Sequence, residues 1–500
     1  MRVLLCLGLV AAVGCAGGDA GPKSADQSGA GDTATIDDSG DGGDTVDSGA
    51  TDSGDSADTG SGEDTGGVGS SVGSRVLVLG PSSTSPLQIA QQLQALLDHD
   101  SLDEDTVVQG IELPSPASTY TSQMTLMTAW YQHTEREGRR ASFEGEWDHV
   151  LLLEAPGTTA PYPEFTFEGL RTLGGHFEAS GARVHLVLEA PRSAFDTAVE
   201  HTYRVADGTG THVIPAGLAA REVEGADDWA VVAATSAFSS LRGKSGSDSA
   251  VAIGALDVDA FHALADRLHA DAEARLDAVY YTGDYVGPVQ VHARDLPDAY
   301  GLMIAGTSSE RNYLSTMETF LSQRGVSHHS AQLGRCDDYK RVDAECVDRA
   351  ADFFATRPYT SLLARGYTVD HSDIVTAGGG DIQSQIYDRH WDATDNDGHN
   401  ALDDLEVRMT WVLEAASDQG LSMLPFHLMF ARYHELDPDV QMMNDGVHTT
   451  GDILYGIAAM SFHSATGQPV ALDGLSETQQ AIAAVGEDCI RQWSTLQEEP

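Results

Sequence analysis

The chain has 500 residues, of which 77 are Asp or Glu and 28 are Lys or Arg, so its formal net charge is −49. A chain this acidic repels polyanions, which excludes nucleic acid and bare anionic lipid as direct partners. The length suits two or three domains. The sequence has no Cys-x-x-Cys pair and no His-rich metal spacing, so we expect no cofactor.

Residues 1–15 consist of one positive charge followed by an apolar run that is too short to span a membrane. The run ends in Ala-Val-Gly-Cys, which resembles a bacterial lipoprotein signal. The resemblance implies that Cys15 is acylated and that this anchor attaches the protein to the membrane as an outer-membrane lipoprotein of the cell envelope. An ordinary cleaved secretion signal is the alternative, and both predict export.

Residues 16–73 contain no aromatic side chain, one basic residue (Lys23) and repeated Asp-Ser-Gly and Asp-Thr-Gly units. Such a segment cannot bury a core, so we predict a disordered, self-repelling acidic tether. Loose calcium binding by the Asp-rich repeats is the less favoured alternative.

From Ser74 onward, short apolar runs alternate with helical patterns. A strand over 75–79 precedes a helix over 86–97, and a strand over 147–153 precedes a helix before the next strand at 182–188. This rhythm predicts an α/β fold, a three-layer sandwich with helices on both faces of a parallel sheet. In such sheets, ligands bind at the carboxyl ends of the strands.

The same rhythm recurs in the second half of the chain. Ser308 follows an apolar strand as Ser82 does, and residues 371–377 and 421–429 read as counterparts of the strands at 147–153 and beyond. We therefore predict two tandem units; one large domain with an insertion is the alternative. The expected parts are units 74–290 and 298–470 and a C-terminal helix over 471–500.

Two Gly-x-Ser turns follow apolar strands, at Ser82 and at Ser308, and a late Asp-x-x-His pair, Asp445 and His448, precedes an apolar helical run. This pattern resembles the SGNH (GDSL-like) hydrolase family. The resemblance implies a serine nucleophile, a histidine base and an aspartate that orients the histidine. Helix capping by Asp445 is the alternative to a catalytic pair.

The resemblance assigns Ser308, Asp445 and His448 to catalysis in the second unit, with Gly334 in the oxyanion hole. The family's Asn is replaced by glycine in Gly378–Asp381, so only a backbone N–H, such as that of Gly380, would remain there. The first unit departs further. Its candidate equivalents of the second-unit triad are Ser82, Asp259 and His262, although the solvated start of a helix over 263–276 is the favoured interpretation of the Asp259–His262 pair. Glu154 follows the third strand in place of the motif, so we interpret this unit as degenerate.

Residues 395–404 resemble a calcium loop of the EF-hand or dockerin type, with Asp395, Asp397 and Asp404 as candidate ligands. The spacing departs from that pattern because Ala393 stands at the first ligand position and Asp404 replaces Glu at the twelfth. An acidic turn that caps the following helix is the favoured alternative.

Cys336 and Cys346 lie close enough in sequence to form a disulfide in an oxidising compartment, which leaves Cys489 unpaired.

Our leading functional hypothesis is a cell-envelope ester hydrolase acting on acyl or carbohydrate esters. The first alternative is a catalytically inactive SGNH-scaffold lipoprotein that binds a glycan or a protein. The second is a calcium-dependent adhesive or structural protein.

Overall fold

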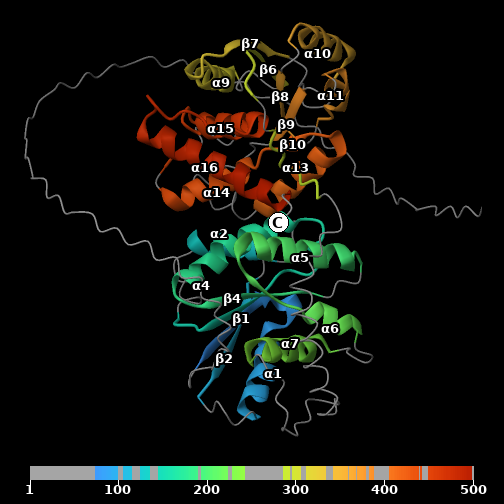
Figure 1. The fold of residues 1–500 in the computed structure, drawn as a ribbon, viewed down its shortest axis with the longest axis vertical. Helices are drawn as coiled ribbons and strands as arrows, with labels where there is room; N and C mark the ends of the chain where they lie inside the picture. Colours follow the sequence, from blue (N-terminus) through green and yellow to red (C-terminus); the bar gives the residue numbers. More distant parts are fainter. Residues whose placement is uncertain are drawn as a thin grey trace, which may run out of the picture. The chain divides into compact units, whose positions relative to one another are not determined.

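The protein folds around two five-stranded, all-parallel sheets with helices on both faces of each (Figure 1). The computed structural model describes residues 74–99, 105–114, 124–135, 145–189, 193–222, 228–242, 285–292, 295–305, 311–333, 342–357, 360–366, 369–378, 382–387, 405–438, 440–441 and 449–497. The predicted signal and tether lie outside these residues. The α/β class expected from the sequence is confirmed.

The first half of the chain supplies one sheet, and its strand order is β2-β1-β3-β4-β5. Its elements are β1 (Arg75–Pro81), η1 (Ser82–Thr84), α1 (Pro86–His99), β2 (Val107–Leu113), α2 (Leu126–Glu135), β3 (His149–Leu153), α3 (Pro163–Gly169), η3 (Leu170–Gly174), α4 (Gly175–Ala179), β4 (Arg183–Val187), α5 (Phe195–Thr209), β5 (His212–Ile214), α6 (Ala216–Glu222) and α7 (Trp229–Arg242). The strands expected at 75–79, 147–153 and 182–188 correspond to β1, β3 and β4.

The second half repeats this order as β7-β6-β8-β9-β10. Its elements are β6 (Ala299–Ala305), α9 (Arg311–Gln323), β7 (Ser327–Gln332), α10 (Ala344–Thr356), β8 (Thr360–Arg365), α11 (Ser372–Gly378), β9 (Ile382–Tyr387), α13 (Leu405–Gln419), β10 (Ser422–Met423), α14 (Phe426–Leu436), α15 (Ile453–Thr466), α16 (Glu477–Ser494) and η5 (Thr495–Gln497). In both halves the second strand along the chain pairs on one side of the first and the third strand on the other. The strand order therefore reverses at the first strand of each sheet, which is β1 in one and β6 in the other.

The internal alignment of the second half was wrong in two places. Residues 371–377, expected as a strand, lie in helix α11, and the third strand of this sheet is β8. Residues 421–429 contain only the two-residue strand β10 before α14 begins, whereas β9 is the fourth strand. The β-branched run Ile374-Val375-Thr376 favours a strand locally. The place beside β6 is occupied by Thr360–Arg365, however, and tertiary pairing overrides that preference.

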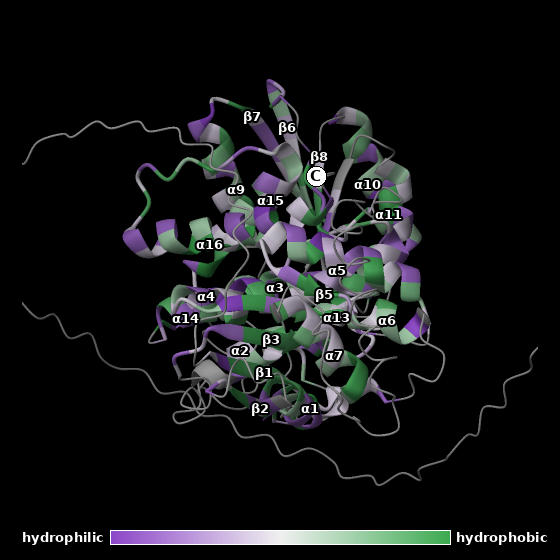
Figure 2. Cartoon of the chain, turned by 60° about the horizontal axis from the view of Figure 1, so that its bottom comes forward, coloured by the Kyte–Doolittle hydropathy of each residue, from purple (hydrophilic) through white to green (hydrophobic). Residues whose placement is uncertain are grey.

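Alternating side chains of the strands face two different cores. Leu77 and Leu79 of β1 enter the main core, while Val76 and Val78 pack towards α1 and α7 on the other face. In β6, residues 302 and 304 face the main core and 303 and 305 face α10. Burial on both faces explains why these strands read as continuous apolar runs. Figure 2 shows the same concentration of apolar residues on β1 and β3.

The main core is continuous between the two sheets. Residues of the first sheet and α3 join the same buried cluster as residues of the second sheet and of α14, α15 and α16. Residues 66–500 accordingly form one compact unit. Trp493 of α16, for example, packs its ring 6.5 Å from that of Phe165 in α3. None of the helices within the described residues is long and apolar enough to cross a membrane.

Cys346 lies buried in α10 and is disulfide-bonded. Its partner lies outside the described residues, as Cys336 does, so the Cys336–Cys346 pairing stays a prediction. Cys489 of α16 is a free, buried thiol.

Candidate active site

Of the residues predicted to form an active site, only Ser82 is described; Glu154, which stands in place of the family's motif in the first unit, is described as well. The other candidates lie outside the described residues: Ser308, Gly334, Gly380, Asp445 and His448 of the second unit, Asp259 and His262 of the first, the calcium candidates Asp395, Asp397 and Asp404, and the lipidation candidate Cys15.

Ser82 lies immediately after β1, on the tight turn that leads into α1. Its side chain is exposed, and the turn closes through a 3.1 Å hydrogen bond from the Ser85 N–H to the Ser82 carbonyl. A Cβ on Gly80 would lie 2.7 Å from the Cβ of Leu153, so only glycine allows β1 to pass this close to the end of β3. The sequence therefore places a serine at the carboxyl edge of the sheet, where strand order reverses.

No histidine within the described part of the chain is hydrogen-bonded to the Ser82 side chain. The nearest polar partners of the turn stabilise its backbone instead: the Thr84 hydroxyl donates to the Pro81 carbonyl at 2.7 Å, and Trp229 Nε1 donates to the Thr84 carbonyl at 3.2 Å. Ser82 thus has the position of a nucleophile but no base among the described residues.

Glu154 follows β3 at the same edge and is buried. Its Oε1 accepts hydrogen bonds from the Leu126 N–H at 3.1 Å and from the Ala155 N–H at 2.7 Å. Burial raises the pKa of Glu154 to about 8, against the opposing effect of these N–H donors. The carboxyl is therefore largely protonated at neutral pH and is directed at the first turn of α2.

A second buried carboxyl reaches the same turn of α2 from the other half of the chain. Glu406 of α13 accepts hydrogen bonds from the hydroxyls of Thr125 and Thr128, both at 3.1 Å. Burial raises the pKa of Glu406 to about 7, and the charges of Glu154 and Glu406 interact. This carboxyl pair joins the two halves at the amino end of α2.

Glu189, after the neighbouring strand β4, repeats this arrangement. Both of its carboxylate oxygens accept from the Gly157 N–H, at 3.0 and 2.9 Å, and burial raises its pKa to about 7. The role of Glu189 was not predicted. A sequence signal existed, because β3 and β4 both run into Leu-Glu-Ala-Pro, at residues 153–156 and 188–191. Within the described residues, the edge of the first sheet is thus lined by carboxyls with raised pKa values, whereas the predicted triad partners Asp259 and His262 lie outside these residues.

Gly380 lies outside the described residues, so the oxyanion role assigned to it stays a prediction. Gly378 ends α11 and Ile382 begins β9, and Ile382 pairs with Thr360, the first residue of β8. Thr360 pairs with Gly301, four residues before the end of β6 at Ala305. Measured along the strands, Ile382 therefore lies about 13 Å before the carboxyl end of β6. The segment that corresponds to the loop after β3 begins at Gly366, after β8.

Helices α9 and α15 pack against each other along their length. Tyr313, in the first turn of α9, donates a 2.5 Å hydrogen bond to Ser461, in the C-terminal half of α15. Tyr455, in the first turn of α15, packs its ring 6.1 Å from Phe320, towards the other end of α9. The two helices therefore run antiparallel. Ser308 and His448 lie outside the described residues, so their pairing stays a prediction.

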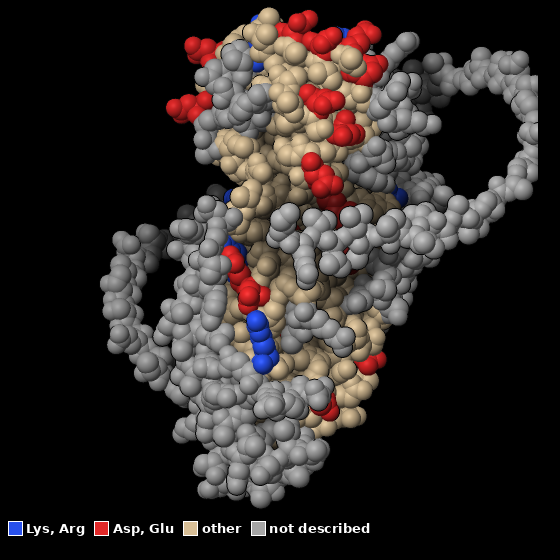
Figure 3. All heavy atoms as spheres, turned by 90° about the vertical axis from the view of Figure 1, so that its right-hand side faces the viewer, with Lys and Arg blue, Asp and Glu red and all other residues tan. Residues whose placement is uncertain are grey.

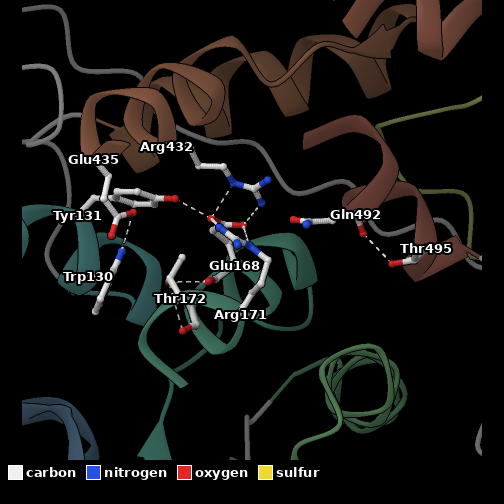
Figure 4. A network of polar contacts seen from close by, with 10 residues as sticks. Trp130, Tyr131, Glu168, Arg171, Thr172, Arg432, Glu435, Gln492 and Thr495 are labelled. Carbon is white, nitrogen blue, oxygen red and sulfur yellow. Dashed lines mark hydrogen bonds and ion pairs between the residues drawn. The ribbon is translucent and has the colours of Figure 1, made fainter. Parts of the chain in front are cut away.

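A buried ionic network connects the two halves away from both strand edges (Figure 4). Glu168 of α3 accepts from Arg171 Nη2 at 2.8 Å, from Arg432 Nε at 3.0 Å and from the Tyr131 hydroxyl at 2.6 Å. Burial acts to raise the pKa of Glu168, but Arg432 and Arg171 outweigh it and hold this pKa well below its usual range. Both carboxylate oxygens of Glu168 accept hydrogen bonds from these neighbours, so we interpret the network as structural.

No group of three or more His, Cys, Asp or Glu side chains within the described ranges is placed to hold a metal ion. The three clustered histidines His149, His185 and His212 lie on adjacent strands of the first sheet, and burial lowers the pKa of His185 to about 3.

Comparison of the sequence with known protein-family models and with curated proteins gives no match, so any functional assignment depends on the residues themselves.

Proposed function

We propose that this protein is a cell-envelope ester hydrolase whose reaction centre lies at the carboxyl edge of the second sheet. The observation that carries the proposal is the repeated strand order of the two sheets. In the first sheet, the Gly-x-Ser turn lies at the reversal of strand order, with Ser82 exposed. Ser308 follows β6, the equivalent strand of the second sheet, at the equivalent position in the sequence.

In this proposal, the Ser308 hydroxyl attacks the ester carbonyl while His448 takes its proton, and Asp445 orients the imidazole. His448 then returns the proton to the departing alcohol, and water releases the acyl group from Ser308. Backbone N–H groups at Ser308 and Gly334 would stabilise the oxyanion. Without the Asn donor of the resembling family, we expect turnover to be about 10²–10³-fold slower than with it.

A catalytically inactive scaffold that binds a glycan or a protein is the second candidate. One observation favours it: the buried, hydrogen-bonded Glu154 where the first sheet would need an oxyanion donor. Both candidates share the proposed lipid anchor at Cys15, because export and attachment do not depend on catalysis.

A fluorophosphonate probe separates the candidates, because it labels only an activated serine. We expect labelling at Ser308 and hydrolysis of p-nitrophenyl acetate by the wild type. Both are abolished by Ser308→Ala and by His448→Ala and retained by the neighbouring control Ser309→Ala. Labelling at Ser82 would move the reaction centre to the first sheet. An unlabelled wild type that hydrolyses no short acyl ester would leave the binding scaffold as the function.

A further inference from the structure

A cavity of about 760 Å³ lies between the two halves of the compact unit, and its described lining does not include Ser82. One wall is formed by Tyr162 and Glu164 at the start of α3, and the opposite wall by the C-terminal half of α13, with Glu414 and Asp418. Residues 285–290 form the third side. Cavities of this volume are typical of small-molecule sites.

The charge of the lining has one sign. Glu164, Glu414 and Asp418 line the cavity, and the described residues that line it include no Lys or Arg. Helix α13 ends at Gln419, beside the cavity, so the partial negative charge of its carboxyl end adds to that of the carboxylates. Acidic side chains also predominate among the charged groups on the face shown in Figure 3. Anionic ligands are therefore excluded, and a positive charge is favoured.

Two tyrosines connect these carboxylates and are themselves held in place. The Tyr162 hydroxyl donates to Glu414 at 3.2 Å, and its ring stacks on Phe165 at 5.4 Å. The Tyr285 hydroxyl donates to Glu164 at 2.5 Å, and its ring meets that of His201 edge-on at 4.7 Å. The aromatic walls are thus preformed, and aromatic faces attract organic cations.

Glu164 is the informative member of this set because it is buried although it lines a cavity. Burial raises its pKa to about 7, against the effect of the Tyr285 hydrogen bond. A buried carboxyl of this kind gains a compensating charge when a cation enters. The buried side chains of Leu413 and Leu421 add apolar surface to the same cavity.

We propose that this cavity binds a small organic cation, an amine or guanidinium that carries an apolar portion. The carboxylates and the end of α13 select the charge, and Tyr162, Tyr285 and the two leucines contact the apolar portion. A bare metal ion fits less well, because the described residues contain no group of three or more ligands placed to hold one. The proposal does not rest on ester hydrolysis, because the described lining residues do not include Ser82 or the turn that carries it.

Titration calorimetry of the full-length protein with phenethylammonium tests the proposal. We expect saturable binding of one cation per chain and at least about tenfold weaker binding of 2-phenylethanol, which has the same shape without the charge. The double variant Glu414→Gln/Asp418→Asn should weaken phenethylammonium binding by about tenfold or more. Both side chains are exposed, so the fold should survive the change.

The matched control is Asp348→Asn/Asp352→Asn, which removes the same charge from two exposed positions of α10. Its affinity should equal that of the wild type. Equal weakening in both double variants would show that phenethylammonium responds only to net charge and would overturn the proposal. Equal binding of 2-phenylethanol, or full competition by equimolar Mg²⁺, would overturn it as well.

Discussion

Replacing Glu168 by Gln should destabilise the protein strongly, because this carboxylate neutralises a buried cation. Glu168 is fully buried, and the Arg432 side chain beside it is 7% exposed, whereas that of Arg171 is 31% exposed. Glu168→Gln keeps the shape of the side chain but leaves Arg432 without its counter-charge. Removing one partner of a buried pair typically costs about 3–5 kcal/mol. Arg171 also donates to Glu168, but because its side chain is partly exposed, the loss of this contact should cost less than the loss of the Arg432 contact.

Urea unfolding of the full-length protein at pH 7 measures this effect. Arg432→Met should cost a similar amount, and the double variant should cost clearly less than the sum, because the two residues share one interaction. The control is Arg491→Met. Its partner is Asp488, and the two side chains are 63% and 46% exposed, so the loss should stay below about 1 kcal/mol. A loss below about 1 kcal/mol for Glu168→Gln would refute the reasoning.

The Glu168–Arg432 pair should also make the stability of the fold depend on pH. Because the folded-state pKa of Glu168 lies below the usual value of about 4.3, its contribution to stability is fully present above that pH. The contribution is then lost as the pH falls through the folded-state pKa. The wild type should therefore lose stability below about pH 4 more steeply than Glu168→Gln does, which acid titration of the unfolding midpoint would measure.

Three further predictions concern other parts of the chain. The pKa of Glu154 is raised to about 8, so the stability from its protonated form is present below the unfolded value and lost as the pH rises through 8. Glu154→Gln should flatten the fall of the thermal midpoint between about pH 5 and 8, and an unchanged slope would contradict this. Peptide mapping without reduction should link Cys346 to Cys336, and detection of a free Cys336 thiol would disprove the pairing. A chain that starts at Ser74 should keep the thermal midpoint of the longer chain; a drop of several degrees would show that residues 16–73 pack on the fold.

The fold class was readable from the sequence because both faces of each sheet are buried. Such strands are then mostly apolar beyond their first residue, as β1 is after the exposed Arg75, and β1, β3 and β4 stand out between amphipathic helices. The position of Ser82 was readable for a related reason, since Gly80 before it permits the close passage of β1 and β3. The second sheet was harder to read because β7 and β9 carry polar residues such as His328 and Gln385.

In the second half of the chain, the local preference of some residues for a strand differs from the structure, because strand pairing in the sheet outweighs it. Ile374 and Val375 read as a strand, yet they lie in α11 because β8 takes the place beside β6. The protonation of Glu154 and of Glu406 was also invisible in the sequence. Glu406 reaches Thr125 from 281 positions away in the sequence and adds to the raised pKa of Glu154, and no local pattern encodes such a contact.

The sequence by itself determined the α/β class, the repeated strand–helix rhythm and the serine after β1, because each depends on neighbours a few residues away. Only the tertiary structure decided the strand order, the buried Glu168–Arg432 pair and the acidic cavity between Tyr162 and α13. The Glu168–Arg432 pair and the cavity lie where the two halves meet. The free energy of such contacts depends on burial and charge in three dimensions, which spacing along the chain does not specify.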